Sequence, residues 1–153
     1  SSVTDVSMFT NATLVSLRNC NNVTNLQGLE LVKTVYVSSH NLSSMQGLGK
    51  NVSVEMCGYF EDVSSLNNVP HVAINCSNKQ INLSALTNIC SLTMRYCSGF
   101  INLKQIRHNC HVKIVMCDRV YGIKSEIIFV ETYDSRNPDK LVIKKTSTNP
   151  LGL

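Results

Sequence analysis

The sequence repeats one short hydrophobic pattern at intervals of about twenty residues. In each copy two apolar residues are separated by one other residue, and Cys most often occupies the sixth position, as in the segment from Leu92 to Cys97. The copies begin at residues 15, 35, 52, 72, 92 and 112, and a less regular seventh copy begins at residue 128. Alternation of apolar and polar residues predicts a half-buried β-strand. Because one such unit cannot bury its own apolar residues, the repeat predicts a solenoid of stacked coils.

The segments between the predicted strands carry apolar residues three positions apart. Before the strand that begins at residue 35, these residues are Val23, Leu26, Leu29 and Val32. A spacing of three is typical of short 3₁₀-helical or extended turns that point one side chain per turn inward. The segment before residue 52 is shorter, and we expect its glycines to absorb the difference. The sequence therefore predicts a mainly β protein, a parallel-β solenoid with short 3₁₀ or extended return segments.

The chain divides into three parts. Residues 1–13 are polar with a few apolar anchors, and we expect them to cap the first coil. Residues 14–133 contain the repeats and form the solenoid. Residues 134–153 contain a turn, a strand expected at 141–145 and a flexible tail. That strand would cap the last coil, because an uncovered strand edge can pair with another chain.

The stretch from Val23 to Val37 joins the two patterns in one repeat. With the strands that end in Cys, it resembles a short leucine-rich repeat and is most similar to the compact repeats of internalin-like proteins. The resemblance covers about residues 12–118, although Val, Ile and Met replace many leucines and Cys or His stands where Asn is commoner. A receptor L domain is the second choice, because Leu26-Gln27-Gly28-Leu29 resembles a phrase of that family. Either resemblance implies a solenoid with capped ends.

Cysteines occupy the sixth position of several repeats. At a tight turn, buried backbone groups need hydrogen-bond partners, and a thiol is small, often buried and able to supply weak ones. We therefore expect an inward-facing structural ladder rather than a metal or redox site. Its expected members are Cys20, His40, Cys57, Cys97 and Cys117.

Cys90 and Cys110 each lie two residues before a predicted strand, so they are expected to be neighbours on adjacent coils. Neighbouring strands are about 4.8 Å apart, which is within the Cα separation that a disulfide accepts. The pair would form a disulfide in an oxidising compartment and remain as thiols in a reducing one. The compartment stays open, since buried thiols favour an intracellular protein and six Asn-x-Ser/Thr sequons favour a secreted or surface protein.

The sequence gives little support for catalysis or for a bound cofactor. The ten carboxylates are spread thinly, and no glycine-rich phosphate loop follows a strand. The spacing of His108, Cys110 and His111 matches no common zinc site. Net charge is +4, the sum of −1 in residues 1–80 and +5 in residues 81–153, and the basic second half favours an acidic partner but falls short of a nucleic-acid-binding signature. We expect no enzyme, no cofactor, no metal site and no membrane span, since the apolar runs are short.

The outward face of the predicted sheet is the best candidate for a functional surface. Exposed Met and Tyr side chains beside Arg have the composition that is enriched at protein interfaces. The residues expected to bind a partner are Tyr36, Met56, Arg95, Tyr96, Lys113, Val115 and Met116. The sequence thus predicts a non-enzymatic protein–protein interaction module. Two alternatives remain: a secreted or cell-surface domain of a receptor or adhesin, and a structural unit that self-associates through its coil ends.

Overall fold

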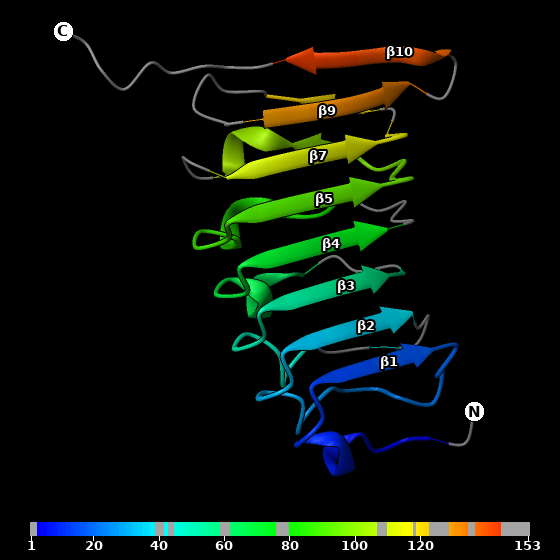
Figure 1. The fold of residues 1–153 in the computed structure, drawn as a ribbon, viewed down its shortest axis with the longest axis vertical. Helices are drawn as coiled ribbons and strands as arrows, with labels where there is room; N and C mark the ends of the chain where they lie inside the picture. Colours follow the sequence, from blue (N-terminus) through cyan, green and yellow to red (C-terminus); the bar gives the residue numbers. More distant parts are fainter. Residues whose placement is uncertain are drawn as a thin grey trace, which may run out of the picture.

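The described strands stack one above another along the molecule, and all run parallel except the last (Figure 1). The computed structural model describes residues 3–38, 42, 45–58, 62–75, 80–106, 110–117, 119–122, 129–134 and 137–144, without the side chains of residues 105 and 129–144. In spatial order the sheet contains β1 (Leu14–Arg18), β2 (Thr34–Ser38), β3 (Ser53–Cys57), β4 (His71–Asn75), β5 (Ser91–Arg95), β7 (His111–Val115), β9 (Phe129–Asp134) and β10 (Asn137–Lys144). The chain is a parallel β-solenoid, as the repeat predicts.

The return segments run behind this sheet as short 3₁₀ turns (Figure 1). Those long enough to be assigned are η1 (Ser7–Phe9), η2 (Ser64–Leu66), η3 (Leu83–Ala85) and η4 (Leu103–Gln105). Backbone hydrogen bonds join residues three apart, as in Leu29 N to Leu26 O and Val32 N to Leu29 O, both 3.2 Å. Each such turn brings one apolar side chain into the core between the return segments and the sheet. The 3₁₀ turns are therefore the cause of the three-residue spacing of apolar residues, as expected.

An Asn or Asp side chain opens most of the described return segments. Its Oδ1 atom accepts a hydrogen bond from the backbone N–H two residues later, at 2.8 to 3.2 Å. The residues in this role are Asp5, Asn25, Asp62, Asn82 and Asn102. The bond from the Ser64 N–H lowers the pKa of Asp62, as the bond from the Ser7 N–H lowers that of Asp5. Such turns suit Asn and Asp because their short side chains mimic a backbone carbonyl.

The first described residues already follow the return-segment pattern. Val3, Val6, Phe9 and Ala12 lie three apart and pack against the core, and Val6 is buried. Thr10 Oγ1 donates a hydrogen bond of 2.9 Å to the carbonyl oxygen of Gly28 in the next return segment. Residues 3–13 thus follow the regular spacing of a return segment, and their role as an N-terminal cap stays a prediction.

Two strands begin two residues later than the sequence pattern predicts. Val54 pairs with Val35 and Val72, so the repeat in β3 begins at residue 54 rather than 52. In the same way Val130 pairs with Val112, so β9 begins its repeat at residue 130 rather than 128. Alternation alone cannot distinguish these frames, because a shift of two residues returns every side chain to the same face.

Asn51 fixes the frame of β3. It is 1% exposed and lies three residues before Val54, as Val32 lies before Val35. Its Nδ2 atom donates to the carbonyl oxygens of Leu29 (2.8 Å) and Val32 (2.6 Å), and its Oδ1 atom accepts from Gly49 N (3.1 Å). A single asparagine therefore joins two consecutive coils from within the core.

Gly47 allows the same two coils to approach closely. Its φ is +99°, and a Cβ atom at this position would collide with the backbone carbonyl of Leu26. Only glycine combines this backbone conformation with this contact at low cost. At Gly47, the glycine expected to adapt the short segment is required by a close contact between two coils.

The last strand closes the far end of the sheet. β10 runs antiparallel to β9, with Leu141 opposite Tyr133 and Lys144 opposite Val130 (Figure 1). β10 overlaps the strand expected at 141–145 but begins earlier, at Asn137, within the predicted turn, and Lys145 lies outside the described residues. None of the described helices has the length and apolar character needed to cross a lipid bilayer.

Candidate functional site

The side chains at the second and fourth positions of each repeat point away from the core and form a continuous surface, which we call the sheet face. Strands β1 to β5 and β7 each bury two alternating residues, and the residues between them are partly or fully exposed. The register of the sheet aligns these exposed positions in two columns. The sheet face consists of Ser16, Arg18, Tyr36, Ser38, Glu55, Cys57, Ala73, Asn75, Thr93, Arg95, Lys113 and Val115.

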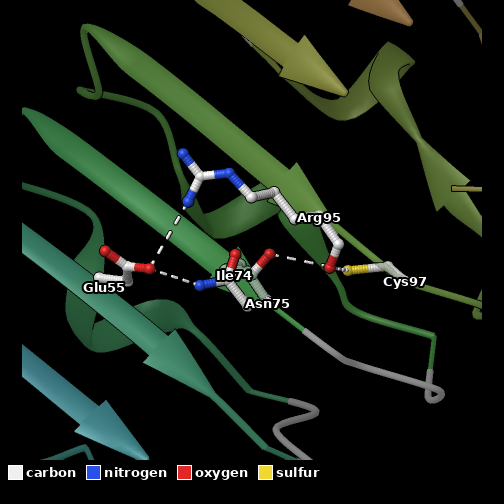
Figure 2. Close-up of polar contacts among 5 residues, drawn as sticks. All are labelled: Glu55, Ile74, Asn75, Arg95 and Cys97. Carbon is white, nitrogen blue, oxygen red and sulfur yellow. Dashed lines mark hydrogen bonds and ion pairs between the residues drawn. The ribbon is translucent and has the colours of Figure 1, made fainter. Parts of the chain in front are cut away.

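A polar network lies at the centre of the sheet face (Figure 2). Glu55 Oε1 accepts a hydrogen bond from Asn75 Nδ2 at 2.6 Å and lies 3.5 Å from Arg95 Nη1. The Glu55 and Arg95 side chains are 34% and 39% exposed, so water screens this ion pair and its contribution to stability is at most about 1 kcal/mol. Its effect is to hold the Arg95 guanidinium over the sheet in one orientation. The Asn75 Oδ1 atom is buried without a hydrogen-bond partner in the described part of the chain.

Beside this network, towards β1, the sheet face contains an open hollow of about 320 Å³. It is lined by Arg18, Asn19, Tyr36, Val37, Ser38, Glu55, Cys57 and Asn75. The volume is at the lower end of the range for small-molecule sites, and the lining is about equally polar and apolar. The hollow suits the seating of a side chain from another molecule.

Tyr96 and Met116 occupy the fifth position of their repeats in a left-handed backbone conformation. Their φ angles are +54° and +51°, and Asn19 has the same conformation, with φ +53°, at the equivalent position after β1. The turn keeps the ladder intact, since Tyr96 N donates to Val115 O and Asn19 N donates to Ser38 O, both at 2.9 Å. Asn tolerates this conformation, whereas bulky side chains rarely adopt it. Tyr96 is 57% exposed and Met116 is half-buried.

Most residues predicted to bind a partner lie on or beside this surface. Tyr36 and Lys113 lie in one column of the sheet face, and Arg95 and Val115 lie in the other. Met56 does not, and its prediction is wrong: its exposure is 0%. In the observed frame of β3, Met56 points into the core, and Glu55 and Cys57 lie on the sheet face.

Three of the residues predicted to form a cysteine ladder have inward-facing thiols that meet backbone carbonyls. Cys97 Sγ donates to Arg95 O (3.3 Å) and to Ile74 O of the preceding coil (3.7 Å), as Figure 2 shows. Cys117 Sγ makes the equivalent bonds to Val115 O (3.3 Å) and Met94 O (3.6 Å). Cys20 is buried, and its Sγ lies 3.4 Å from Arg18 O.

The two other predicted ladder residues do not share this position. Cys57 is the fourth residue of its repeat, where it pairs with Ser38 and Asn75 and is partly exposed, because β3 is shifted by two residues. His40 lies outside the described residues. The hydrogen bond that Cys117 makes with Cys97, followed by burial, raises the pKa of the Cys117 thiol. The Cys117 thiol is therefore not a ready nucleophile.

Cys90 and Cys110 lie on adjacent coils, as predicted, and both are free thiols. His111 N donates to Cys90 O at 2.9 Å, which places the two residues side by side in the stack. Cys90 is exposed and Cys110 is buried. Burial raises the pKa of Cys110 to about 11, and the nearby Cys90 adds a smaller effect in the same direction. A disulfide between them stays a prediction for an oxidising compartment.

The structure brings together a second group that sequence reasoning missed. Beyond the ends of β5 and β7, the short strands β6 (Ile101–Asn102) and β8 (Val120–Tyr121) pair in parallel. There the rings of Phe100 and Tyr121 meet edge to face, with centroids 6.3 Å apart and an interplanar angle of 76°. The Arg119 guanidinium lies 5.1 Å from the Phe100 ring centroid. The only sequence signal was an aromatic residue in each of two consecutive repeats.

The described residues contain no group of three or more His, Cys, Asp or Glu side chains that could hold a metal ion. What the site offers is therefore an ordered array of polar and aromatic contacts. Comparison with models of known protein families, with curated proteins and with solved structures gave no significant match.

Proposed function

We propose that the chain is a non-enzymatic, protein-binding module of the leucine-rich-repeat type that contacts its partner through the sheet face and the adjoining side chains of Tyr96 and Met116. The observation that carries this proposal is the placement of Tyr96 and Met116. Both are apolar or aromatic, both reach solvent, and both stand in a backbone conformation that favours Asn or Gly.

The cost of that placement argues for a role outside folding. A left-handed conformation costs a non-glycine residue roughly 1–2 kcal/mol. Asn19 shows that the turn itself can be made with a tolerant residue. Because the exposed side chain of Tyr96 and the half-buried side chain of Met116 gain little from burial in return, their placement in this conformation supports contact with another molecule.

The surroundings supply what a protein interface needs. Arg95 precedes Tyr96 in the chain and is oriented by Glu55, while the hollow beside Asn75 offers a recess for a partner side chain. Tyr and Arg are the residue types that most often dominate binding energy at interfaces. The inward thiols of Cys97 and Cys117 fit a structural role under this surface, since they satisfy carbonyls of successive coils.

The leucine-rich-repeat assignment draws its support from the coil geometry. Each coil combines one short parallel strand with a return segment whose buried residues lie three apart. An Asn or Asp opens most of the described return segments with the same turn. This regularity is what the resemblance of the stretch from Val23 to Val37 implies.

The test is a capture experiment with matched double variants. Tyr96→Asn/Met116→Asn removes the exposed side chains but installs the residue that β1 uses at this position, so the fold should be kept. The control, Met8→Asn/Leu31→Asn, removes comparable apolar surface from side chains that are 75% and 70% exposed on the return segments. We expect the first variant alone to lose a partner, with affinity reduced at least about thirtyfold, the equivalent of a hot spot of 2 kcal/mol.

Two results would contradict the proposal. Equal capture by wild type and by Tyr96→Asn/Met116→Asn, with unchanged circular dichroism and melting temperature, would remove the sheet face from consideration. Loss of the partner in the control variant only would place the interface on the return segments.

The sequons give only partial support to the alternative that the chain is a secreted or cell-surface domain. Asn11, Asn22 and Asn82 have exposed side chains, which a glycan could extend into solvent. Asn51, in contrast, is buried and uses its amide nitrogen for two hydrogen bonds, and the Asn75 nitrogen binds Glu55. A glycan on Asn51 is incompatible with this fold, so mass spectrometry of the secreted protein should find that site unmodified.

A further inference from the structure

The aromatic group beyond β5 and β7 forms a surface of its own, which we call the aromatic edge and define as Phe100, Lys104, Arg119 and Tyr121. Phe100 and Tyr121 are 49% and 44% exposed, and Lys104 and Arg119 are also exposed. The described residues contain three exposed aromatic side chains, these two and Tyr96, and all three lie in two consecutive repeats. Tyr96 precedes Phe100 by four residues in the chain.

The aromatic edge is held rigidly. In the parallel pair of β6 and β8, Asn102 lies opposite Tyr121. Gly122 lies so close to Lys104 that a Cβ atom on the glycine would be 2.7 Å from Lys104 Cγ. The two rings and the guanidinium are fixed by their mutual contacts. A surface whose groups are ordered before binding loses less entropy when a partner docks.

The charge of this region is one-sided. Residues 90–122 contain five Lys or Arg and one acidic residue, Asp118, which lies outside the described residues. Their excess of four positive charges equals the net charge of the whole chain. Such a concentration attracts an acidic partner and speeds its association at low salt.

The geometry favours carboxylates over nucleic-acid bases. One face of the Phe100 ring is covered by Arg119 and Tyr121 meets it edge to face, so the rings do not form an open stacking platform. A guanidinium on an aromatic ring is held in plane, and its outer N–H groups can bind a carboxylate with two hydrogen bonds. We propose that the aromatic edge binds an acidic segment of the partner protein, with Arg119 receiving a carboxylate and the two rings receiving an apolar side chain. This inference rests on the proposed function and names the chemistry of its partner.

The experiment selects ligands from a random peptide library displayed on phage, with wild-type protein as the target. We expect the selected peptides to be enriched in Asp and Glu with at least one apolar side chain. Their synthetic forms should bind at least about tenfold more weakly to Arg119→Glu. The matched control Lys33→Glu makes the same charge reversal at an exposed residue outside both proposed surfaces and should bind as wild type does. Affinity should fall with rising salt.

Several results would overturn the inference. These are selection of neutral or basic peptides, failure to enrich any peptide, or equal binding to Arg119→Glu. Tighter binding of single-stranded oligo-dT than of the acidic peptides, lost in Arg119→Glu, would assign the surface to nucleic acid instead. Phe100→Ser, which keeps the charge, should also weaken the peptides, and unchanged binding to it would exclude the rings from the site.

The two proposals can fail separately. If Tyr96→Asn/Met116→Asn loses the partner while Arg119→Glu keeps it, the sheet face binds a protein and the aromatic edge has no part in it. If neither variant loses a partner and no peptide is enriched, the proposed function fails as well. Circular dichroism of each variant shows that the solenoid is intact.

Discussion

Replacement of Asn51 by Leu should destabilise the protein more than most surface or core changes of similar size. Asn51 is the one polar residue in the buried core of the described chain. Its amide supplies three hydrogen bonds, two to the carbonyl oxygens of Leu29 and Val32 and one from Gly49 N. Leu fits the volume and matches the apolar residues at the equivalent position of other coils, but it can make none of these bonds.

The expected magnitude follows from the groups left without partners. A buried polar group without a hydrogen bond costs about 1–3 kcal/mol. Val32 O loses the bond from Asn51, whereas Leu29 O keeps the bond from Val32 N, and water can partly replace the lost acceptor of the half-buried Gly49. We therefore expect Asn51→Leu to lower the free energy of unfolding by about 2–4 kcal/mol, a large share of the total stability of an ordinary domain.

Urea denaturation followed by circular dichroism measures this loss. The control is Asn88→Leu, because Asn88 is exposed and its Nδ2 atom makes one side-chain bond, 2.9 Å to Asn68 Oδ1. The control should lose less than about 1 kcal/mol. A loss of similar size in both variants, with unchanged dependence on urea concentration, would contradict the argument that Asn51 joins two coils and fixes the frame of β3.

Four further predictions test other parts of the structure. In urea titrations, Met56→Ala should lower the free energy of unfolding by about 2–5 kcal/mol. Val52→Ala should lower it by less than about 1 kcal/mol. A larger loss in Val52→Ala than in Met56→Ala would instead support a repeat that begins at residue 52. Tyr96→Gly should leave the melting temperature equal or higher, whereas Tyr96→Val should lower it, because a β-branched residue tolerates a positive φ least. Burial raises the pKa of Cys110 from an ordinary 9.0 to about 11, so the folded state holds this proton more tightly than the unfolded state does. Stability should therefore be fully present below pH 9.0 and fall as pH rises towards about 11, and the decline of the melting temperature should be shallower in Cys110→Ala. Gly47→Ala should cost about 2 kcal/mol or more, since its Cβ would meet the Leu26 carbonyl, and a loss below 1 kcal/mol would contradict that contact.

The fold was predictable because its signals are local and repeated. Val35 and Val37 alternate within one strand, and Leu26 and Leu29 are three apart in one return segment, so each period can be recognised without distant residues. The frame of β3 was not predictable from the sequence, because Val52, Val54 and Met56 extend the alternation in both directions. The deciding interaction is that of Asn51 with carbonyls about twenty residues earlier, which no local pattern contains.

The candidate site was predictable in part for the same reason. Given the strands, the columns that contain Tyr36, Arg95 and Lys113 follow from alternation alone. The aromatic edge was missed because Phe100 and Tyr121 do not share a repeat position, and they meet only through the pairing of β6 with β8. The left-handed turn had a signal that we overlooked, an Asn at the fifth position of the first repeat.

The central claim is that a partner protein contacts the surface around Tyr96. The most direct test replaces Tyr96 with a photo-crosslinking phenylalanine analogue and, in a second protein, replaces Leu31 in the same way. Leu31 is 70% exposed on a return segment and controls for nonspecific contact. The account predicts that illumination in extract of the source cells joins a discrete protein to position 96 and not to position 31. The same products from both positions, or none from position 96, would contradict it.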